Sequence, residues 1–167
     1  DDVRASIDHL MQQSIEGLIA VAPQTRVVPI LDEMQLPVPV RIVSSTGSSA
    51  PTATFNDQVA GARAAVRHLA DLGHTRILHI AGPRDWLEAD HRMRGYLAEM
   101  DAQDLSPRPP VLGDWTAQFG FEAGLELLRT EDATAVFAGN DHMALGFMHA
   151  VRAIGSCLLY TSDAADE

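Results

Sequence analysis

The sequence predicts an α/β fold with parallel sheets that are flanked by helices. Short apolar runs, typical of buried strands, alternate along the chain with longer segments whose apolar residues recur at helical spacing. The clearest run, residues 77–80, follows Gly73, which is placed to end one helix, and precedes Gly82, where a turn leads into the next helix. A strand between two helices is joined to its neighbours by crossover connections, so the strands are expected to be parallel.

The first third of the chain contains two such pairs of helix and strand. Apolar residues at helical spacing predict a helix over residues 4–14 and another that begins at Val27. Apolar runs predict strands over residues 15–21 and 38–43. Serine, glycine and proline are concentrated in residues 44–51, which are therefore expected to form a surface loop after the second strand.

A long helix is predicted after Asp57, whose carboxylate is placed to accept a hydrogen bond from the first turn. The residues expected on or near its packed face are Ala60, Ala64, Ala65, Leu69 and Leu72.

The last third of the chain repeats the alternation. A strand is expected over residues 111–113, a helix from Asp114 onward, a strand over residues 134–138 and a final helix capped by Asn140 and Asp141. The apolar stripe of the first of these helices is expected to comprise Phe119, Ala123, Leu127 and Leu128, and the second helix carries Met143, Leu145, Met148 and Val151.

Composition excludes several classes of protein. Hydrophobic residues make up 46% of the 167 residues and charged residues 21%, which is ordinary for a folded domain and too apolar for a disordered one. The net charge of −11 argues against binding of nucleic acid by these residues themselves. The single cysteine excludes a disulfide within the chain, and no apolar run reaches the roughly 20 residues that span a bilayer.

A candidate binding site follows the central strand. In open α/β sheets, ligands bind at the carboxyl ends of the strands, and Trp86, Glu88 and Arg92 come just after such an end. They offer an aromatic face, a hydrogen-bond acceptor and a planar donor, a combination that suits a small polar ligand. The alternative interpretation is a capped helix with a solvated charged face.

The stretch from Leu72 to Tyr96, LGHTRILHIAGPRDWLEADHRMRGY, resembles the effector-binding core of the lactose-repressor (LacI/GalR) family of bacterial transcription regulators. The family pattern is L-G-H-x-x-I-x-x-I-x-G-P, followed by an arginine, two residues and Gly-aromatic. Three further motifs fit in order, VPVRIV before this stretch and GDWTAQFGFEAG and TAVFAGNDHMALG after it.

This resemblance implies a periplasmic-binding-protein-like fold with two lobes, both incomplete in this chain. Residues 1–55 would belong to the N-terminal lobe and residues 56–155 to the C-terminal lobe. The implied function is the sensing of a small effector, a sugar or a related polar molecule, by a cytoplasmic regulator. Such a regulator is a homodimer that binds operator DNA through an N-terminal helix-turn-helix, which this chain lacks.

The resemblance also assigns roles to residues of the site. In the family the arginine at the position of Arg92 anchors the effector, and an aromatic ring at the position of Trp115 lies against the flat face of a sugar or base. Trp86 and Glu88 fall where the family varies its ligand contacts. The alternatives are a surface arginine paired with Glu88 or Glu99, and a tryptophan that only fills the core.

Two further residues complete the predicted effector site. Asn140 can donate and accept hydrogen bonds at a strand end, and the alternative for it is a turn residue before an Asp141 cap. Ser44 falls where many family members carry an acidic sugar-binding residue, so this chain departs from the family pattern there.

Other functions have less support from the residues. A secreted sugar-binding receptor of a transporter shares the fold and is the main alternative. An enzyme is not expected, because no nucleophile and base pair or phosphate-binding glycine loop is present, and no cofactor or metal site is predicted. His68 and His74 are not spaced to bind a metal together on one helix face.

The end of the chain has an unusual sequence. Residues 157–167, CLLYTSDAADE, correspond to the translation of DNA that resembles a transposon-end adapter used in shotgun sequencing libraries. Residues 156–167 are therefore interpreted as a non-native tail and left out of the fold prediction.

Overall fold

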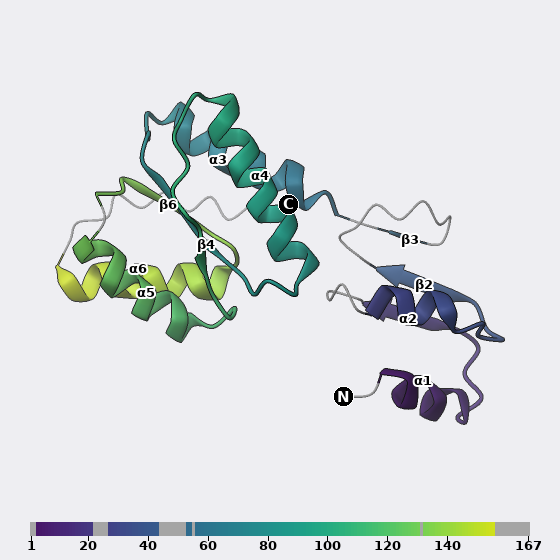
Figure 1. The fold of residues 1–167 in the computed structure, drawn as a ribbon. Helices are drawn as coiled ribbons and strands as arrows, with labels where there is room; N and C mark the ends of the chain where they lie inside the picture. The colour runs from purple at the N-terminus through teal and green to yellow at the C-terminus, as the bar shows by residue number, and fades with distance from the viewer. Residues whose placement is uncertain (1–2, 22–26, 44–52, 55, 131, 156–167) are drawn as a thin grey trace.

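The computed structural model describes residues 3–21, 27–43, 53–54, 56–130 and 132–155. Helices and strands alternate along the chain and form two separate three-stranded sheets (Figure 1). In chain order the elements are α1 (Val3–Met11), β1 (Leu18–Val21), α2 (Val27–Glu33), β2 (Val40–Val43), β3 (Ala53–Thr54), α3 (Gln58–Asp71), β4 (Ile77–Ala81), α4 (Leu87–Ala102), β5 (Val111–Leu112), α5 (Ala117–Thr130), β6 (Ala135–Ala138) and α6 (Asp141–Ile154).

The first sheet has the strand order β1-β2-β3, and each pair is parallel. Its inner face packs on the first two helices through a cluster built around Ile7 and Leu31, with Leu18, Ala20 and Ile42 packed against it. The side chains of alternate residues point to opposite faces of a strand. Residues 19, 21, 41 and 43 are accordingly exposed on the other face.

The second sheet has the order β5-β4-β6, again with parallel pairs, so β4 lies in the centre. All five residues of β4 are buried. Figure 1 shows α3 and α4 on one side of this sheet and α5 and α6 on the other. Val66, Ile77, Tyr96 and Met100 form the core between the sheet and the first of these helix pairs.

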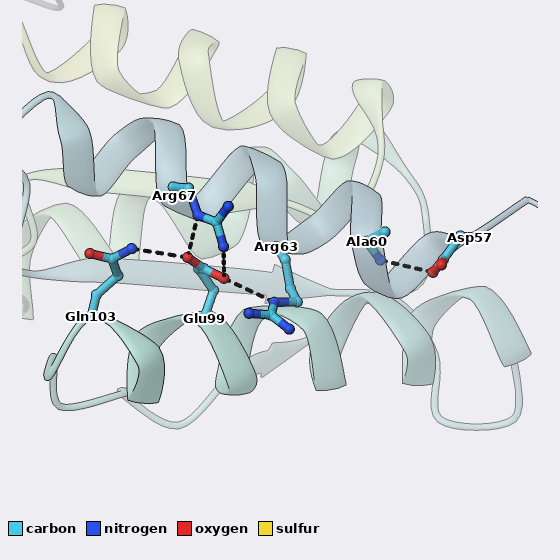
Figure 2. A network of polar contacts seen from close by, with 6 residues as sticks. All are labelled: Asp57, Ala60, Arg63, Arg67, Glu99 and Gln103. Carbon is cyan, nitrogen blue, oxygen red and sulfur yellow. Dashed lines mark hydrogen bonds and ion pairs between the residues drawn. The ribbon is translucent and has the colours of Figure 1, made fainter.

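A buried carboxylate joins α3 to α4. Glu99 is fully buried and accepts hydrogen bonds from Arg63 at 2.9 Å, from Arg67 at 2.7 Å and from Gln103 at 3.0 Å (Figure 2). The hydrogen bonds from Arg67, Gln103 and Arg63 lower the pKa of the Glu99 carboxyl to about 2, so it is ionised at neutral pH. Since both arginines lie on α3, this network fixes the packing of the two helices that border the site.

The prediction of the packed face of α3 was wrong in part. Ala62 and Val66 are the buried residues of this helix, whereas Ala60 and Ala64 are exposed and Leu72 is 53% exposed. The helix packs on α4 through Ala62 and Val66, which are four residues apart and lie on the same face. Because alanines occur on every face of the helix, the sequence alone does not show which face is packed. By contrast, Asp57 caps α3 as predicted, accepting from the backbone N–H of Ala60 at 2.9 Å.

Other local predictions were also corrected. Leu145 on α6 is 58% exposed because Gly146, beside it, is the residue that packs closely on α5. The short strand β3 was not predicted, and β1 begins at Leu18 rather than at residue 15. The predicted loop over residues 44–51 and the tail over residues 156–167 lie outside the described residues.

Candidate effector site

The candidate site lies at the carboxyl edge of the second sheet, where its three strands end together. Gly82 and Gly139 follow β4 and β6, and Gly113 follows β5. Their backbones continue the pairing beyond the strands, since Gly113 N–H donates to Ala81 O at 2.8 Å and Gly139 N–H to Ile80 O at 2.7 Å. The absence of side chains at these positions lets other groups approach the strand ends closely.

The indole ring of Trp115 lies directly on Gly82. A methyl group at Gly82 would overlap the indole carbons Cζ2 and Cη2, so only glycine fits there with this ring position. The backbone of Trp115 adopts a φ of 73°, a left-handed conformation that costs a tryptophan roughly 1–2 kcal/mol. A hydrogen bond of 3.0 Å from Asn140 Nδ2 to the Trp115 carbonyl holds this conformation. The ring is therefore positioned by the surrounding structure at some cost.

A second tryptophan lies beside the first. Trp86, the residue before α4, has its ring centroid 5.7 Å from that of Trp115, with an angle of 72° between the planes. An edge-to-face pair of this kind is favourable and presents two aromatic surfaces at a large angle to each other. The two residues that were predicted separately from the sequence thus form one aromatic corner.

Arg92 borders both this aromatic corner and a pocket. Its Nε donates to Gln58 Oε1 at 2.8 Å and its Nη1 donates to the carbonyl of Gly139. Its Cζ lies 5.8 Å from the centre of the Trp115 ring. The hydrogen bonds that hold Arg92 thus come from its Nε and Nη1 groups.

The pocket beside Arg92 has a volume of about 340 Å³, and Gln58, Gly139, Asn140 and Asp141 are among the residues that line it. Burial lowers the pKa of Arg92, and the charges of Glu88 and Asp141 oppose this shift. Because a guanidinium is not deprotonated in proteins, Arg92 is a cation. Glu99, one of the two predicted alternative partners of Arg92, bonds Arg63 and Arg67 instead. The side chain is anchored by an amide and a carbonyl.

Two polar atoms of the predicted site are buried without a partner among the described residues. They are Oε2 of Glu88 and the indole Nε1 of Trp115. A buried polar atom that makes no hydrogen bond costs about 1–3 kcal/mol, so these two positions are costly for the folded chain. Glu88 therefore does not lie on a simple solvated helix face, as the alternative interpretation of the sequence had it.

Asn140 has a clear structural role. Its Oδ1 accepts from the backbone N–H of Met143 at 2.9 Å, which makes it the N-cap of α6, and its Nδ2 donates to Trp115. Asn140, and not Asp141, is therefore the N-cap of α6, and both the oxygen and the nitrogen of its side-chain amide already have hydrogen-bond partners. A direct contact between Asn140 and an effector stays a prediction. The same holds for Ser44, which lies outside the described residues.

Sequence reasoning missed several residues that hold Arg92 or line its pocket, among them Gln58, Gly139 and Asp141. A signal for Gly139 was present, because β4 and β6 both end in an alanine that is followed by glycine, so that the two glycines occupy equivalent strand ends. Gln58 gave no signal. As the first residue of α3, it reaches Arg92 only because α3 and α4 pack together.

A buried histidine lies in the core beside the site. His79 on β4 stacks on Phe137, with ring centroids 4.6 Å apart, and lies 5.2 Å from the ring of Tyr96. Its Nδ1 is 2.9 Å from the carbonyl of Phe137. Burial lowers the pKa of His79 to about 4, so the ring is neutral at pH 7 and adds no charge beside Arg92. The described residues contain no cluster of side chains that could hold a metal ion.

The comparison with protein families identifies the class of the chain. A family model described as periplasmic binding proteins and the sugar-binding domain of the LacI family matches residues 1–163. The chain belongs to this family. The predicted family and the predicted fold class, parallel sheets flanked by helices, are therefore confirmed.

Individual relatives are transcription regulators. The lactose operon repressor of Escherichia coli K12 is 29% identical over 91% of this chain, which spans 43% of that protein. The ribose operon repressor of the same organism is 33% identical over 87% of this chain and 46% of its own length. The solved complex of the transcriptional regulator CelR with cellobiose is 29% identical, with a TM-score of 0.78 over 93% of this chain and 49% of that one.

The chain thus spans less than half the length of these relatives. None of the three is an enzyme or a transport receptor by its name, so the comparison does not favour the secreted receptor that the sequence left open. No helix among the described residues is long and apolar enough to cross a membrane.

Proposed function

We propose that this chain is the effector-sensing part of a LacI-type transcription regulator, and that its effector is a sugar or a related small polar molecule. The observation that carries this proposal is the carboxyl edge of the second sheet. Trp115 is held there in a costly conformation beside Arg92, while polar atoms of Trp115 and Glu88 are buried without partners. The cellobiose complex of the relative CelR supports a carbohydrate as the class of ligand.

Each side chain has a chemical task in this proposal. The indole of Trp115 packs on the apolar C–H face of a sugar ring, and Trp86 limits the space beside it. The guanidinium of Arg92 donates to ligand oxygens, with its orientation fixed by Gln58 and Gly139. Asn140 holds Trp115 in place, and Glu88 accepts a hydrogen bond from the ligand.

The mechanism concerns a regulator built from two lobes, with residues 1–55 in one and residues 56–155 in the other. A ligand bound between lobes favours the arrangement in which both contact it. It shifts the equilibrium between arrangements only by the difference in its affinity for them. In a homodimer that carries helix-turn-helix heads, such a shift changes how the heads meet operator DNA. Such a protein acts in the cytoplasm, where operator DNA is found.

Titration calorimetry on the protein expressed from its complete reading frame tests the site. Cellobiose, lactose and ribose serve as probes, because relatives are named for or bound to these sugars. We expect at least one to bind. Arg92→Lys keeps the charge but loses the planar fork, and we expect it to weaken binding about 10- to 100-fold, as the loss of a charged hydrogen bond predicts.

The matched control is Arg94→Lys, two residues along the same helix, where the arginine is exposed and pairs with Asp90. This variant should bind the same sugar with unchanged affinity. Equal binding by the Arg92 and Arg94 variants would contradict the assignment of Arg92, and no binding of any of the three sugars would contradict a carbohydrate site of this type.

A further inference from the structure

A second pocket lies between α4 and the connection that leads into β5. Its volume is about 450 Å³, within the roughly 300–1,000 Å³ that is usual for small-molecule sites. The residues that line it are Arg84, Asp90, Met93, Pro109, Pro110 and Leu112. None of them lines the pocket beside Arg92, so the two pockets have different walls.

The connection that forms one wall of this pocket is held at both ends. Tyr96, which is fully buried on α4, accepts a hydrogen bond of 3.2 Å from the N–H of Arg108, the residue before Pro109. At the other end, Leu112 pairs with Ala81 of the central strand β4. Proline also fixes its own backbone φ, which limits movement between these two points. The wall is therefore in place before a ligand arrives, and binding does not have to order it.

Most of the lining is apolar. Met93, Pro109, Pro110 and Leu112 contribute C–H groups and one thioether. The two prolines carry no backbone N–H, so they give this wall no hydrogen-bond donor. A polyhydroxylated ligand would leave hydroxyl groups without partners against such a wall, which is unfavourable. An aromatic ring, by contrast, packs favourably on C–H groups and on a thioether sulfur.

The two charged residues of the lining are not equivalent. Asp90 forms an ion pair with Arg94, one turn further along α4, so its charge is compensated. Arg84 lies exposed in the turn between β4 and α4, and it has no ion-pair partner among the described residues. Its neighbour Asp85 is exposed as well but does not line the pocket. The pocket thus combines an apolar wall with one uncompensated cation.

We infer that this pocket is a second ligand site, separate from the candidate effector site, and that it takes an aromatic carboxylate. The ring packs on Met93 and the two prolines, and the carboxylate binds the guanidinium of Arg84 through paired hydrogen bonds. A neutral ring cannot form these bonds. A small anion without a ring would satisfy Arg84 but leave the apolar lining in contact with water. The inference does not depend on which effector binds at Arg92.

Benzoate, benzyl alcohol and acetate test the two requirements separately, because benzyl alcohol lacks the charge and acetate lacks the ring. The protein, expressed from its complete reading frame, is labelled with carbon-13 at its methionine methyl groups and titrated with each compound by NMR. Met93→Leu assigns the signal of Met93. We expect benzoate to shift this signal, to leave that of Met34 at the first sheet unchanged, and to bind about tenfold more tightly than the other two compounds.

Arg84→Gln tests the role of the cation. Because Arg84 is exposed in a turn, the variant should keep its fold, and we expect it to bind benzoate about tenfold more weakly, at the level of benzyl alcohol. Arg129→Gln is the matched control. It removes the same charge from an exposed position at the end of α5, on the other side of the second sheet, and should leave the affinity for benzoate unchanged.

The opposite results would overturn the inference. An unshifted Met93 signal would mean that benzoate does not enter the pocket. Equal affinity for benzyl alcohol would remove the need for a charge, and equal affinity for acetate would mean an adventitious ion only. Equal weakening by the Arg84 and Arg129 variants would mean general attraction by charge. Benzoate that is displaced by a sugar and weakened by Arg92→Lys would occupy the effector site instead, which would overturn the inference and leave the proposed function in place.

Discussion

The two sheets of this protein differ in how their faces are covered. In the second sheet every residue of the central strand β4 is buried, and helices lie on both sides. In the first sheet half-buried and exposed residues alternate, and Ile19 and Val21 are 74% and 73% exposed on the face away from α1 and α2. Parallel sheets are normally covered on both faces. Among the described residues, the first sheet is therefore covered by helices on one face only.

This difference explains why the candidate site belongs to the second sheet. A binding site needs side chains that are held in one position before the ligand arrives. The packed helices α3 and α4 hold Arg92 through Gln58, and the glycines at the strand ends receive the ring of Trp115. The described part of the first sheet offers no comparable set of fixed polar groups.

The largest expected difference between the sheets concerns their apolar residues. Ile80→Ala removes a fully buried side chain from β4 and should lower the free energy of unfolding by about 2–5 kcal/mol. Ile19→Ala removes the same atoms from an exposed position and should change it by less than about 0.5 kcal/mol. Urea unfolding of both variants measures this. Equal losses would mean that Ile19 is covered in the folded protein, and the contrast between the sheets would fail.

Acid should weaken the second sheet through His79. In the unfolded chain a histidine takes up a proton near pH 6.5, whereas burial lowers the pKa of His79 in the folded protein to about 4. Between these values the unfolded state binds more protons, so stability is complete above pH 6.5 and falls as the pH drops to about 4. The whole loss is on the order of 3 kcal/mol.

The measurement is urea unfolding at pH 7.5 and at pH 4.5, for the unmodified protein and for His79→Leu. The leucine variant lacks the titrating ring, so its stability should depend less on pH over this range. His9→Leu, in the exposed part of α1, is the control and should leave the pH dependence unchanged. A His79 variant with the same pH dependence as the unmodified protein would show that this ring is not buried in its neutral form.

Replacing a glycine next to a strand with alanine should affect stability and sugar binding in the second sheet but not in the first. Gly82→Ala forces the ring of Trp115 to move, and overpacking of this kind costs about 1–3 kcal/mol. Gly17→Ala, beside the first sheet, places its new methyl 3.4 Å from the carbonyl of Pro39, an ordinary contact. We expect the first variant to lose stability and sugar binding and the second to keep both. Tryptophan fluorescence and calorimetry check the two expectations.

Local signals in the sequence were sufficient for the framework of the second sheet. The apolar run of β4 and the Asp57 cap depend on a few neighbouring residues, and Gly73 ends its helix with a φ of 89°, as its position after α3 predicted. The apolar stripe of α3 could not be chosen from its alanines, because the correct face is defined only by contact with α4.

The site was predictable in its residue types but not in its internal contacts. Trp86, Arg92 and Trp115 come close together, as their positions at strand ends and the family resemblance indicated. Two features had no local signal, the left-handed backbone of Trp115 and the anchoring of Arg92 by Gln58. Both arise from packing between segments far apart in the chain, which no short pattern contains.

The smallest expected effect comes from comparing two helix N-caps beside the second sheet, of which only one also contacts a residue of the candidate site. Asp57 and Asn140 are both N-caps, of α3 and α6, and replacing either with alanine should cost about 1 kcal/mol of stability. Only Asn140 also donates to the carbonyl of Trp115, so Asn140→Ala should release the strained backbone and weaken sugar binding several-fold, while Asp57→Ala leaves binding unchanged. Urea unfolding and calorimetry on both variants make the comparison. If both variants bind the sugar equally well, Trp115 keeps its position without Asn140, and the packing of its ring on Gly82 must then be what holds the aromatic corner in place.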